Sequence, residues 1–329
     1  MKYKVVRLAV IFDQVLSAGG GYQQALNISI SMYKFKERKS YSLKFFTIYS
    51  ENIPILSGYG IDVELIKISK FNRAWLKVRS LIYSDHILKN IQKYVGLNKF
   101  EKSLIDKDID LVYFLSPSSW SNYLEKLNYI ITVWDLCHRD MPEFPEVYEN
   151  RVFERREVGF NRSLTRAIAV IVDSKLGKDN IIRRYMVDES RIHILPFSPA
   201  LSIQNVKQKS SVSIKDKFKI LGDYIFYPAQ FWAHKNHAYI LQGLTALKDE
   251  YNIKISAVFS GGDAGNLSYI KSLVDELDLT DQVHFLGFVD NADIVTLYEN
   301  SIALVMPTYF GPTNIPPLEA FTLGTPVLY

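Results

Sequence analysis

The chain alternates short apolar runs with longer segments in which apolar residues recur every three or four positions. Short apolar runs bounded by turn residues are typical of buried parallel strands, and the periodic segments are typical of the helices that connect them. Parallel sheets need helices on both faces, because both faces carry apolar side chains. The pattern therefore predicts an α/β protein, and the 329 residues suit two domains.

In the first half of the chain, the pattern predicts a doubly wound sheet. We expect its strands at Val5–Phe12, Ser42–Ile48, Leu111–Leu115, Tyr129–Val133 and Ala167–Val172. Between the first two strands we expect a glycine turn at Gly19–Gly21 and a helix at Tyr22–Tyr33. Each later strand is followed by a helical or irregular connection, as crossovers between parallel strands require.

A polar segment then interrupts the alternation. Residues 198–217 are poor in large apolar side chains and include SIQNVKQKSSVSIKDK, which suits an exposed linker. We therefore expect an N-terminal domain at residues 1–200, a linker at 201–217 and a C-terminal domain at 218–329.

The alternation resumes after this linker. We expect strands at Tyr224–Tyr227, Lys254–Phe259, Val283–Leu286, Ile302–Met306 and Pro326–Leu328, and helices at Ala238–Leu247, Leu267–Leu277, Ala292–Asn300 and Pro317–Leu323. The last strand has no helix after it, and a strand without a covering helix leaves a sheet edge exposed. We therefore expect the second domain to be incomplete in this chain.

The composition, with 48% apolar and 22% charged residues, is typical of a soluble globular protein. No run approaches the roughly 20 apolar residues of a membrane span, and the first residues do not resemble a signal peptide. The single cysteine, Cys137, excludes an intramolecular disulfide and a cysteine-based metal site. We expect a cytoplasmic protein in which Cys137 is buried.

In α/β proteins, ligands bind at the loops that follow parallel strands. The first such loop, SAGGGYQQ at residues 17–24, places Gly19, Gly20 and Gly21 where backbone N–H groups can approach an anion or a sugar at a helix N-terminus. A tight turn is the alternative. Gln24 stands where a dinucleotide-binding fingerprint has its third glycine, which disfavours a nicotinamide-dependent oxidoreductase.

A second loop, YPAQFWAHKNH at residues 227–237, places Lys235 and Asn236 at the expected start of a helix. A cation is unfavourable beside the positive end of the helix dipole unless an anion lies between them. A diphosphate would supply that anion, and a solvated surface lysine is the alternative.

A third loop lies within MPTYFGPTNIPPLEAFTLGTPVLY, residues 306–329, where glycine, small polar residues and prolines precede a helix. Such a loop can present N–H donors near the start of the helix. We expect Glu319 in the first turn of that helix, where its carboxylate could accept two hydrogen bonds from a ribose or complement the helix dipole.

These segments, in this order, resemble the family 4 glycosyltransferases, which have the GT-B fold. The resemblance covers nearly the whole chain, and it also rests on VWDLCHRDMPEFPE (133–146), AVIVDSKLGKDNIIRRYMVDESRIHILPFS (169–198), FSGGDAG (259–265) and VHFLGFV (283–289). It implies two Rossmann-like domains facing a cleft, with the acceptor on the side of residues 1–200 and a nucleotide sugar bound by residues 218–329.

The resemblance also implies site residues. Lys235 matches the family's phosphate-binding lysine, and Glu319 matches the glutamate that holds the donor ribose. The other donor-binding candidates are Gly19, Gly20, Gly21, Gly262, Gly287, Phe288, Val289, Thr313, Asn314 and Ile315. Asp135 and His138 lie in the loop usually near the reacting sugar and join Lys235 as catalytic candidates. Turn capping for Asp135 and an ordinary loop histidine for His138 are the alternatives.

Two positions depart from the family pattern. Gly311 stands where the family commonly has a glutamate, and Gln230 where it commonly has an arginine. We keep both as donor-binding positions and expect backbone groups around Asn314 to compensate. The departures suggest the alternative of a non-catalytic nucleotide- or carbohydrate-binding relative.

The implied reaction retains the anomeric configuration: the acceptor hydroxyl attacks on the face from which the nucleoside diphosphate departs, without a protein nucleophile. Positioning and stabilisation of the leaving charge by Lys235 would carry catalysis, so no metal or other cofactor is expected. The Asp-x-Asp cluster of Asp106, Asp108 and Asp110 precedes a strand instead of following one, and we interpret it as a solvated turn.

Residues 1–104 carry 17 Lys and Arg against 7 Asp and Glu. Basic residues alternate with aromatic ones at 32–46 and 71–100, which suits either an anionic membrane surface presenting a lipid-linked glycan acceptor or an ordinary amphipathic helix. No nucleic-acid recognition motif accompanies this charge, and nucleic acid is not an expected partner. We therefore expect a glycosyltransferase of surface polysaccharide biosynthesis at the inner face of the membrane.

Overall fold

The computed structural model describes residues 5–16, 20–35, 41–80, 87, 90, 93–94, 96–204, 213–311 and 313–329. The chain forms two compact units. The first unit comprises Met1–Leu136 and Glu154–Pro196, and the second comprises Cys137–Phe153 and Phe197–Tyr329. The second unit therefore includes a segment, residues 137–153, that interrupts the sequence of the first.

The first unit is built on a seven-stranded parallel sheet with the order β3–β2–β1–β4–β5–β6–β7. Its strands are β1 Val6–Phe12, β2 Tyr41–Thr47, β3 Val63–Leu65, β4 Leu111–Phe114, β5 Asn128–Val133, β6 Ala169–Val172 and β7 Ile192–Ile194. The five strands predicted from the sequence are confirmed. β3 and β7 were not predicted, because three residues are too few to show a period.

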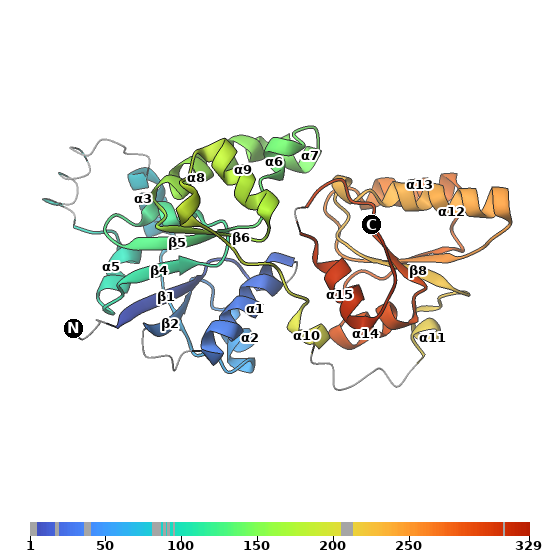
Figure 1. The fold of residues 1–329 in the computed structure, drawn as a ribbon, viewed down its shortest axis with the longest axis horizontal. Helices are drawn as coiled ribbons and strands as arrows, with labels where there is room; N and C mark the ends of the chain where they lie inside the picture. Colours follow the sequence, from blue (N-terminus) through green and yellow to red (C-terminus); the bar gives the residue numbers. More distant parts are fainter. Residues whose placement is uncertain are drawn as a thin grey trace. The chain divides into compact units, whose positions relative to one another are not determined.

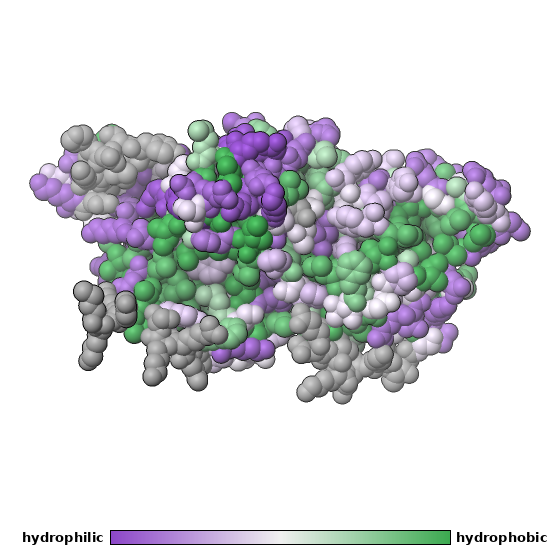
Figure 2. All heavy atoms as spheres, viewed as in Figure 1, coloured by the Kyte–Doolittle hydropathy of each residue, from purple (hydrophilic) through white to green (hydrophobic). Residues whose placement is uncertain are grey.

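Helices cover both faces of this sheet (Figure 1). They are α1 Gly20–Lys34, α2 Asn52–Gly58, α3 Lys70–Ser80, α5 Lys99–Ile105, η1 Ser119–Tyr123, α8 Val152–Arg166, α9 Lys175–Tyr185 and η3 Glu189–Arg191. Side chains alternate along β1, so Ala9 and Ile11 pack in the core with α5, α8 and α9, whereas Val10 and Phe12 pack with α1 and α2. The outward side of α8 is hydrophilic in Figure 2.

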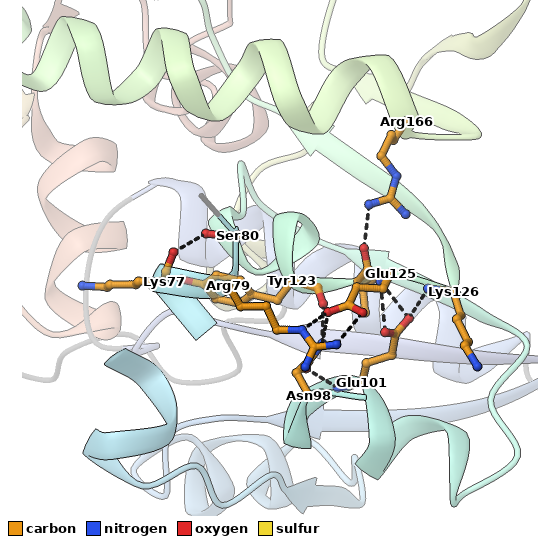
Figure 3. Close-up of polar contacts among 10 residues, drawn as sticks. Lys77, Arg79, Ser80, Asn98, Glu101, Tyr123, Glu125, Lys126 and Arg166 are labelled. Carbon is orange, nitrogen blue, oxygen red and sulfur yellow. Dashed lines mark hydrogen bonds and ion pairs between the residues drawn. The ribbon is translucent and has the colours of Figure 1, made fainter. Parts of the chain in front are cut away.

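A buried polar network joins α3 and α5 to the start of β5 (Figure 3). The carboxylate of Glu101, which is fully buried, accepts hydrogen bonds from the backbone N–H groups of Glu125, Lys126 and Leu127 at 2.6–3.0 Å. Arg79, only 3% exposed, forms a two-point ion pair with Glu125. The network fixes the end of α3 against the sheet.

The second unit has a five-stranded parallel sheet with the order β10–β9–β8–β11–β12. Its strands are β8 Tyr224–Pro228, β9 Ser256–Ser260, β10 Val283–Phe285, β11 Ala303–Val305 and β12 Val327–Leu328. All five were predicted from the sequence and are confirmed to within two residues. The two doubly wound sheets are those expected of a GT-B fold.

The helices of the second unit include α12 and α13 on one face of its sheet and α14 and α15 on the other (Figure 1). They are α6 Cys137–Asp140, α7 Pro145–Tyr148, η2 Glu149–Arg151, α10 Leu201–Gln204, α11 Ile214–Phe218, η4 Ala233–Lys235, α12 His237–Tyr251, α13 Leu267–Glu276, α14 Asn291–Asn300 and α15 Ile315–Leu323. α10 and α11 fall within the segment expected to be a linker, and their Ile203 and Ile214 are buried. None of the helices in the described part of the chain is long and apolar enough to cross a membrane.

Candidate functional site

Two loops at the carboxyl end of the second sheet meet at Lys235. The ammonium of Lys235, in the loop after β8, donates a hydrogen bond to Oδ1 of Asn314 in the loop after β11, at 3.1 Å. The carbonyl of Lys235 accepts from the hydroxyl of Tyr227 at 2.9 Å. Both the backbone and the side chain of Lys235 are therefore held in place.

The local backbone differs slightly from the predicted helix start. Lys235 ends the short helix η4, and α12 begins two residues later at His237. Asn236 between them has a left-handed backbone (φ 56°), and its side-chain amide donates to the carbonyl of Pro307 at 3.1 Å. This second bridge between the same two loops reinforces the contact of Lys235 with Asn314.

The prediction that Glu319 lies in the first turn of its helix is wrong. α15 begins at Ile315, before Pro316 and Pro317, so Glu319 lies in the second turn. Proline is favourable in the first turn of a helix, because the N–H groups there have no partner within the helix, so the pair does not delay the start of α15.

Glu319 is engaged by protein groups. Its carboxylate accepts a hydrogen bond from the hydroxyl of Tyr298 at 3.0 Å and another from the backbone N–H of Ala200. Burial raises the pKa of Glu319 above its usual range, and these two hydrogen bonds partly oppose that rise. A ribose at this carboxylate would share it with Tyr298.

Gly311 has a backbone that a side chain would strain. Its φ is 131°, and a Cβ built on it would lie 2.7 Å from Nδ2 and 2.8 Å from Oδ1 of Asn314. The amide of Asn314 also donates to the carbonyl of Gly311 at 3.3 Å and to the hydroxyl of Tyr329 at 2.8 Å. The space that a side chain at 311 would need is taken by Asn314.

His234, one residue before Lys235, joins three segments. Its backbone N–H donates to the carboxylate of Glu146 at 3.0 Å, and its ring Nδ1 bonds the same oxygen. Its carbonyl accepts from the backbone N–H of Tyr309 at 2.9 Å, and its ring stacks on Phe310. Sequence reasoning missed Glu146 and His234, because no local pattern pairs residues 88 positions apart.

The third group of donor-binding candidates surrounds two glycine turns. The backbone N–H of Gly261 donates to the carbonyl of Gly287 at 2.8 Å, which joins the loops after β9 and β10. A Cβ on Gly262 would lie 3.3 Å from the ring of Phe288, which is 73% exposed. Val289 instead packs against the core of the unit. Gln230 accepts from the indole N–H of Trp232 at 3.0 Å.

In the first unit, the glycine loop differs from the predicted turn. Gly19 lies outside the described residues, whereas Gly20 starts α1 and Gly21 lies in its first turn. A Cβ on Gly21 would lie 2.3 Å from the ring of Trp134, so glycine is needed for this close packing.

Thr313 and Ile315, the remaining loop candidates, flank Asn314 in the second unit.

Asp13 is a partly buried acid that sequence reasoning missed. It follows β1 directly and lines a small recess with Gly21, Tyr22, Ser116 and Trp134. Burial raises the pKa of Asp13, although the hydroxyls of Ser118 and Ser116 donate to it, the latter at 2.7 Å. Its place at the carboxyl end of a strand was the signal that could have identified it.

The structure places Asp135 and His138 in different settings. Asp135 follows β5 and forms an ion pair with Arg156 of α8 at 2.6 Å, and its carbonyl accepts from the same side chain at 2.9 Å. His138 lies on α6, is fully buried and packs edge-on against Phe153. Cys137 is buried, as expected.

The Asp-x-Asp cluster lies at the amino end of β4. Asp110 accepts from Nε of Arg7 at 2.9 Å, and Asp108 has the left-handed backbone (φ 61°) of a turn. The cluster is therefore not among the loops at the carboxyl ends of the strands. Among the described residues, no group of three or more His, Cys, Asp or Glu side chains is arranged to hold a metal ion.

Comparisons with known proteins agree with this architecture. Residues 212–329 match the family model described as glycosyl transferases group 1. The chain is 26% identical over 185 residues to the O-antigen chain mannosyltransferase RfbU of Salmonella typhimurium. The matched region covers 56% of this chain and 48% of RfbU. It is 26% identical over 191 residues to the serotype-specific mannosyltransferase WbdA of Escherichia coli, covering 57% of this chain and 22% of WbdA. The chain thus spans half or less of these curated relatives.

Solved structures show the same fold over the whole chain. Anabaena HepE in complex with UDP-glucose superposes with a TM-score of 0.68 and 13% identity, covering 98% of this chain and 79% of HepE. A glycosyltransferase from Rickettsia africae superposes with a TM-score of 0.66 and 14% identity, covering 99% of this chain and 79% of the other. The chain therefore has the GT-B fold, and its residues 212–329 are similar to the glycosyl transferases group 1.

Proposed function

We propose that this chain acts in a retaining glycosyltransferase of the family 4 type, which moves a hexose from a nucleoside diphosphate sugar to a glycan or lipid-linked acceptor of a surface polysaccharide. The observation that carries the proposal is the contact of Lys235 with Asn314, directly before α15. A cation and a helix N-terminus together favour a diphosphate, because both attract negative charge.

The names of the relatives support the same class of reaction. RfbU and WbdA are mannosyltransferases, and HepE has been solved with UDP-glucose. The exposed ring of Phe288, beside Gly262 and Gly287, suits stacking on a nucleobase. The donor would then lie with its base toward the loops after β9 and β10 and its diphosphate toward Lys235.

In the proposed mechanism, Lys235 and the N-terminus of α15 stabilise the negative charge that develops on the departing diphosphate. Positioning of the two substrates supplies the rest of the rate enhancement, and no metal or cofactor is required. Asp135 and His138 remain candidates for contacts to the reacting sugar. The pairing of Asp135 with Arg156 suits a positioning role more than proton transfer.

We also propose that the first unit contacts an anionic membrane surface, where a lipid-linked acceptor would be presented. α3 carries Lys70, Arg73 and Lys77 together with Phe71, which is 81% exposed. Cationic side chains and an exposed aromatic ring are the groups that bind anionic lipid interfaces. Residues 81–86, 88–89, 91–92 and 95 of the basic stretch at 71–100, and residues 36–40 of the stretch at 32–46, lie outside the described residues.

A binding experiment tests the donor site. Titration calorimetry of the chain with UDP, GDP and ADP should show binding of at least one, and Lys235→Ala should weaken it by about tenfold or more. Lys248→Ala is a matched control, because Lys248 lies in the last turn of α12, near the amino ends of the strands. Failure of the chain to bind any of the three nucleotides would overturn the proposal.

A non-catalytic nucleotide-binding protein is the second candidate, because Glu319 and Gln230 already bond protein groups. Slow hydrolysis of a nucleotide sugar without acceptor separates the two candidates. Turnover that is lost in Lys235→Ala supports the transferase, whereas tight binding without turnover of any common donor supports the second candidate.

A further inference from the structure

We infer that Asn314 is a positioning residue for Lys235, and that the neutrality of its amide is the property that the donor site requires. The inference rests on the proposed function and concerns how the site binds a nucleoside diphosphate. Three contacts define the arrangement: Oδ1 accepts from Lys235, and Nδ2 donates to Gly311 and to Tyr329. The two N–H groups of Nδ2 are therefore both engaged, one within the loop at Gly311 and one at Tyr329 after β12.

The sequence around Asn314 explains why its side chain reaches Lys235. Asn314 occupies the N-cap position of α15, where an asparagine normally accepts from the N–H of the second or third helical residue. Those residues are Pro316 and Pro317, which have no N–H. Asn314 makes no side-chain cap, and its amide oxygen is therefore available to Lys235.

The same prolines increase the importance of Lys235. The first turn of a helix binds anions through its N–H groups, and α15 lacks two of these donors. The ammonium of Lys235 brings N–H donors and a full positive charge to the same end of the helix. It therefore compensates for the donors that Pro316 and Pro317 remove.

The choice of an amide over a carboxylate has an electrostatic reason. An acid at 314 would attract the ammonium by a charge-assisted contact and would repel a diphosphate at the same place. The amide oxygen fixes the ammonium by a hydrogen bond and adds no negative charge. The contact thus orients Lys235 without competing with the ligand for its charge.

Gly311 is part of the same arrangement. Because a Cβ at 311 would lie 2.7 Å from the amide of Asn314, any other residue there would displace that amide. Glycine at 311 therefore leaves the space that the amide of Asn314 occupies. The loop holds Lys235 through this neutral amide.

The test compares diphosphates with nucleosides. Binding of UDP, GDP, uridine and guanosine to the full chain is measured by calorimetry for wild type, Asn314→Asp and Asn314→Ala. We expect Asn314→Asp to weaken diphosphate binding by about tenfold or more and Asn314→Ala by about threefold. Nucleoside binding should change less than twofold in both, because neither variant touches the base.

Asn252→Asp is the matched control for the change of charge. Asn252 is exposed at the end of α12, near the amino ends of the strands, so this variant should bind diphosphates as wild type does. Gly311→Ala should weaken diphosphate binding as Asn314→Ala does. Melting curves for each variant establish that it is folded.

Two results would overturn the inference. One is diphosphate binding by Asn314→Asp equal to that of wild type, and the other is an equal loss of nucleoside and diphosphate affinity, which would show general damage. If Asn314→Asp does not fold, Asn314→Ala and Gly311→Ala decide by the same criteria. Failure of the wild-type chain to bind any nucleotide is a different outcome, which overturns the proposed function together with the inference.

Discussion

The imidazole of His234 stacks on the ring of Phe310, with centroids 3.9 Å apart and planes at 12°. The stack joins the loop after β8 to the loop after β11, immediately beside Lys235. Phe144, from the inserted segment, packs edge-on against both rings, with centroids 6.3 Å and 5.5 Å away. The position of Lys235 therefore depends on a segment that lies far away in the sequence.

Glu146→Ala should destabilise the second unit and weaken nucleotide binding. The substitution leaves the buried N–H of His234 without its acceptor, which costs about 1–3 kcal/mol. Chemical denaturation and calorimetry with UDP or GDP measure the two effects. Glu143→Ala, at an exposed position in the same segment, should change neither. Equal stability of the Glu146 and Glu143 variants would contradict a structural role for the pair.

His237 should make stability depend on pH. Burial lowers the pKa of His237 to about 3, with the positive charge of Lys235 as a further cause. The folded pKa of His237 lies below its unfolded pKa near 6.5, so the folded protein favours the neutral imidazole. The stability that results is present above pH 6.5 and is lost as the pH falls toward 3. Between pH 6.5 and 5 the loss is about 2 kcal/mol.

The variant that tests this is His237→Phe, because the ring of His237 already stacks on Phe231, with centroids 4.4 Å apart. Its free energy of unfolding should fall less than that of wild type between pH 6.5 and 5. The comparison is between slopes, so a change in overall stability does not affect it. Parallel pH profiles for the two proteins would show that His237 does not titrate on unfolding.

Asp13→Asn should raise the stability of the first unit at neutral pH. Burial raises the pKa of Asp13, because the charged carboxylate is less favourable in the folded protein than in the unfolded chain. The folded protein is therefore most stable below the unfolded pKa near 3.9, and it loses that stability as the pH rises through the folded pKa. At neutral pH the wild type bears the cost of burying this acid, and asparagine does not. Thermal unfolding at neutral pH should therefore give a higher Tm for Asp13→Asn than for wild type.

The control for Asp13 is an acid whose pKa is shifted in the opposite direction. Hydrogen bonds from Ser190 lower the pKa of Asp188, which is exposed in the same unit. Asp188→Asn should therefore leave stability unchanged or reduce it slightly at pH 7. A fall in Tm for Asp13→Asn would mean that the serine hydroxyls more than compensate for burial of the carboxylate.

Two glycines of the second unit should respond oppositely to alanine. Gly243 lies within α12, and a Cβ there meets no atom within 4 Å, so Gly243→Ala should stabilise by about 1 kcal/mol. Gly261 has a φ of 150°, and its Cβ would lie 2.4 Å from the carbonyl oxygen of Ala229. Gly261→Ala should destabilise by about 2 kcal/mol or more. Denaturation curves of the two variants measure both changes.

Much of the fold was predictable because parallel strands have a strong local signal. The strands of both sheets were expected within two residues, apart from β3 and β7, which are too short to show a pattern. The starts of α1 and α15 were misplaced, because glycine and proline were interpreted as turn residues. In the structure, Gly20 starts α1, Gly21 packs closely against Trp134 in the first turn of that helix, and Pro316 lies in the first turn of α15.

The site was predictable in part. Resemblance pointed to Lys235 and Asn314, and the structure brings their side chains together. Long-range pairs such as Glu146 with His234 were not predictable, because nothing in a local segment specifies its distant partner. The domain prediction missed residues 137–153 for the same reason: composition indicates a linker but not the core in which a segment packs.

The inserted segment has a consequence for recombining this chain with its relatives. A chimera that replaces residues 197–329 alone would place a relative's loop, in the position of His234, against the Glu146 and Phe144 of this chain. Exchange of residues 137–153 together with 197–329 would transfer the supporting side chains intact. The second unit is therefore expected to be exchangeable between relatives as two stretches of sequence, not one.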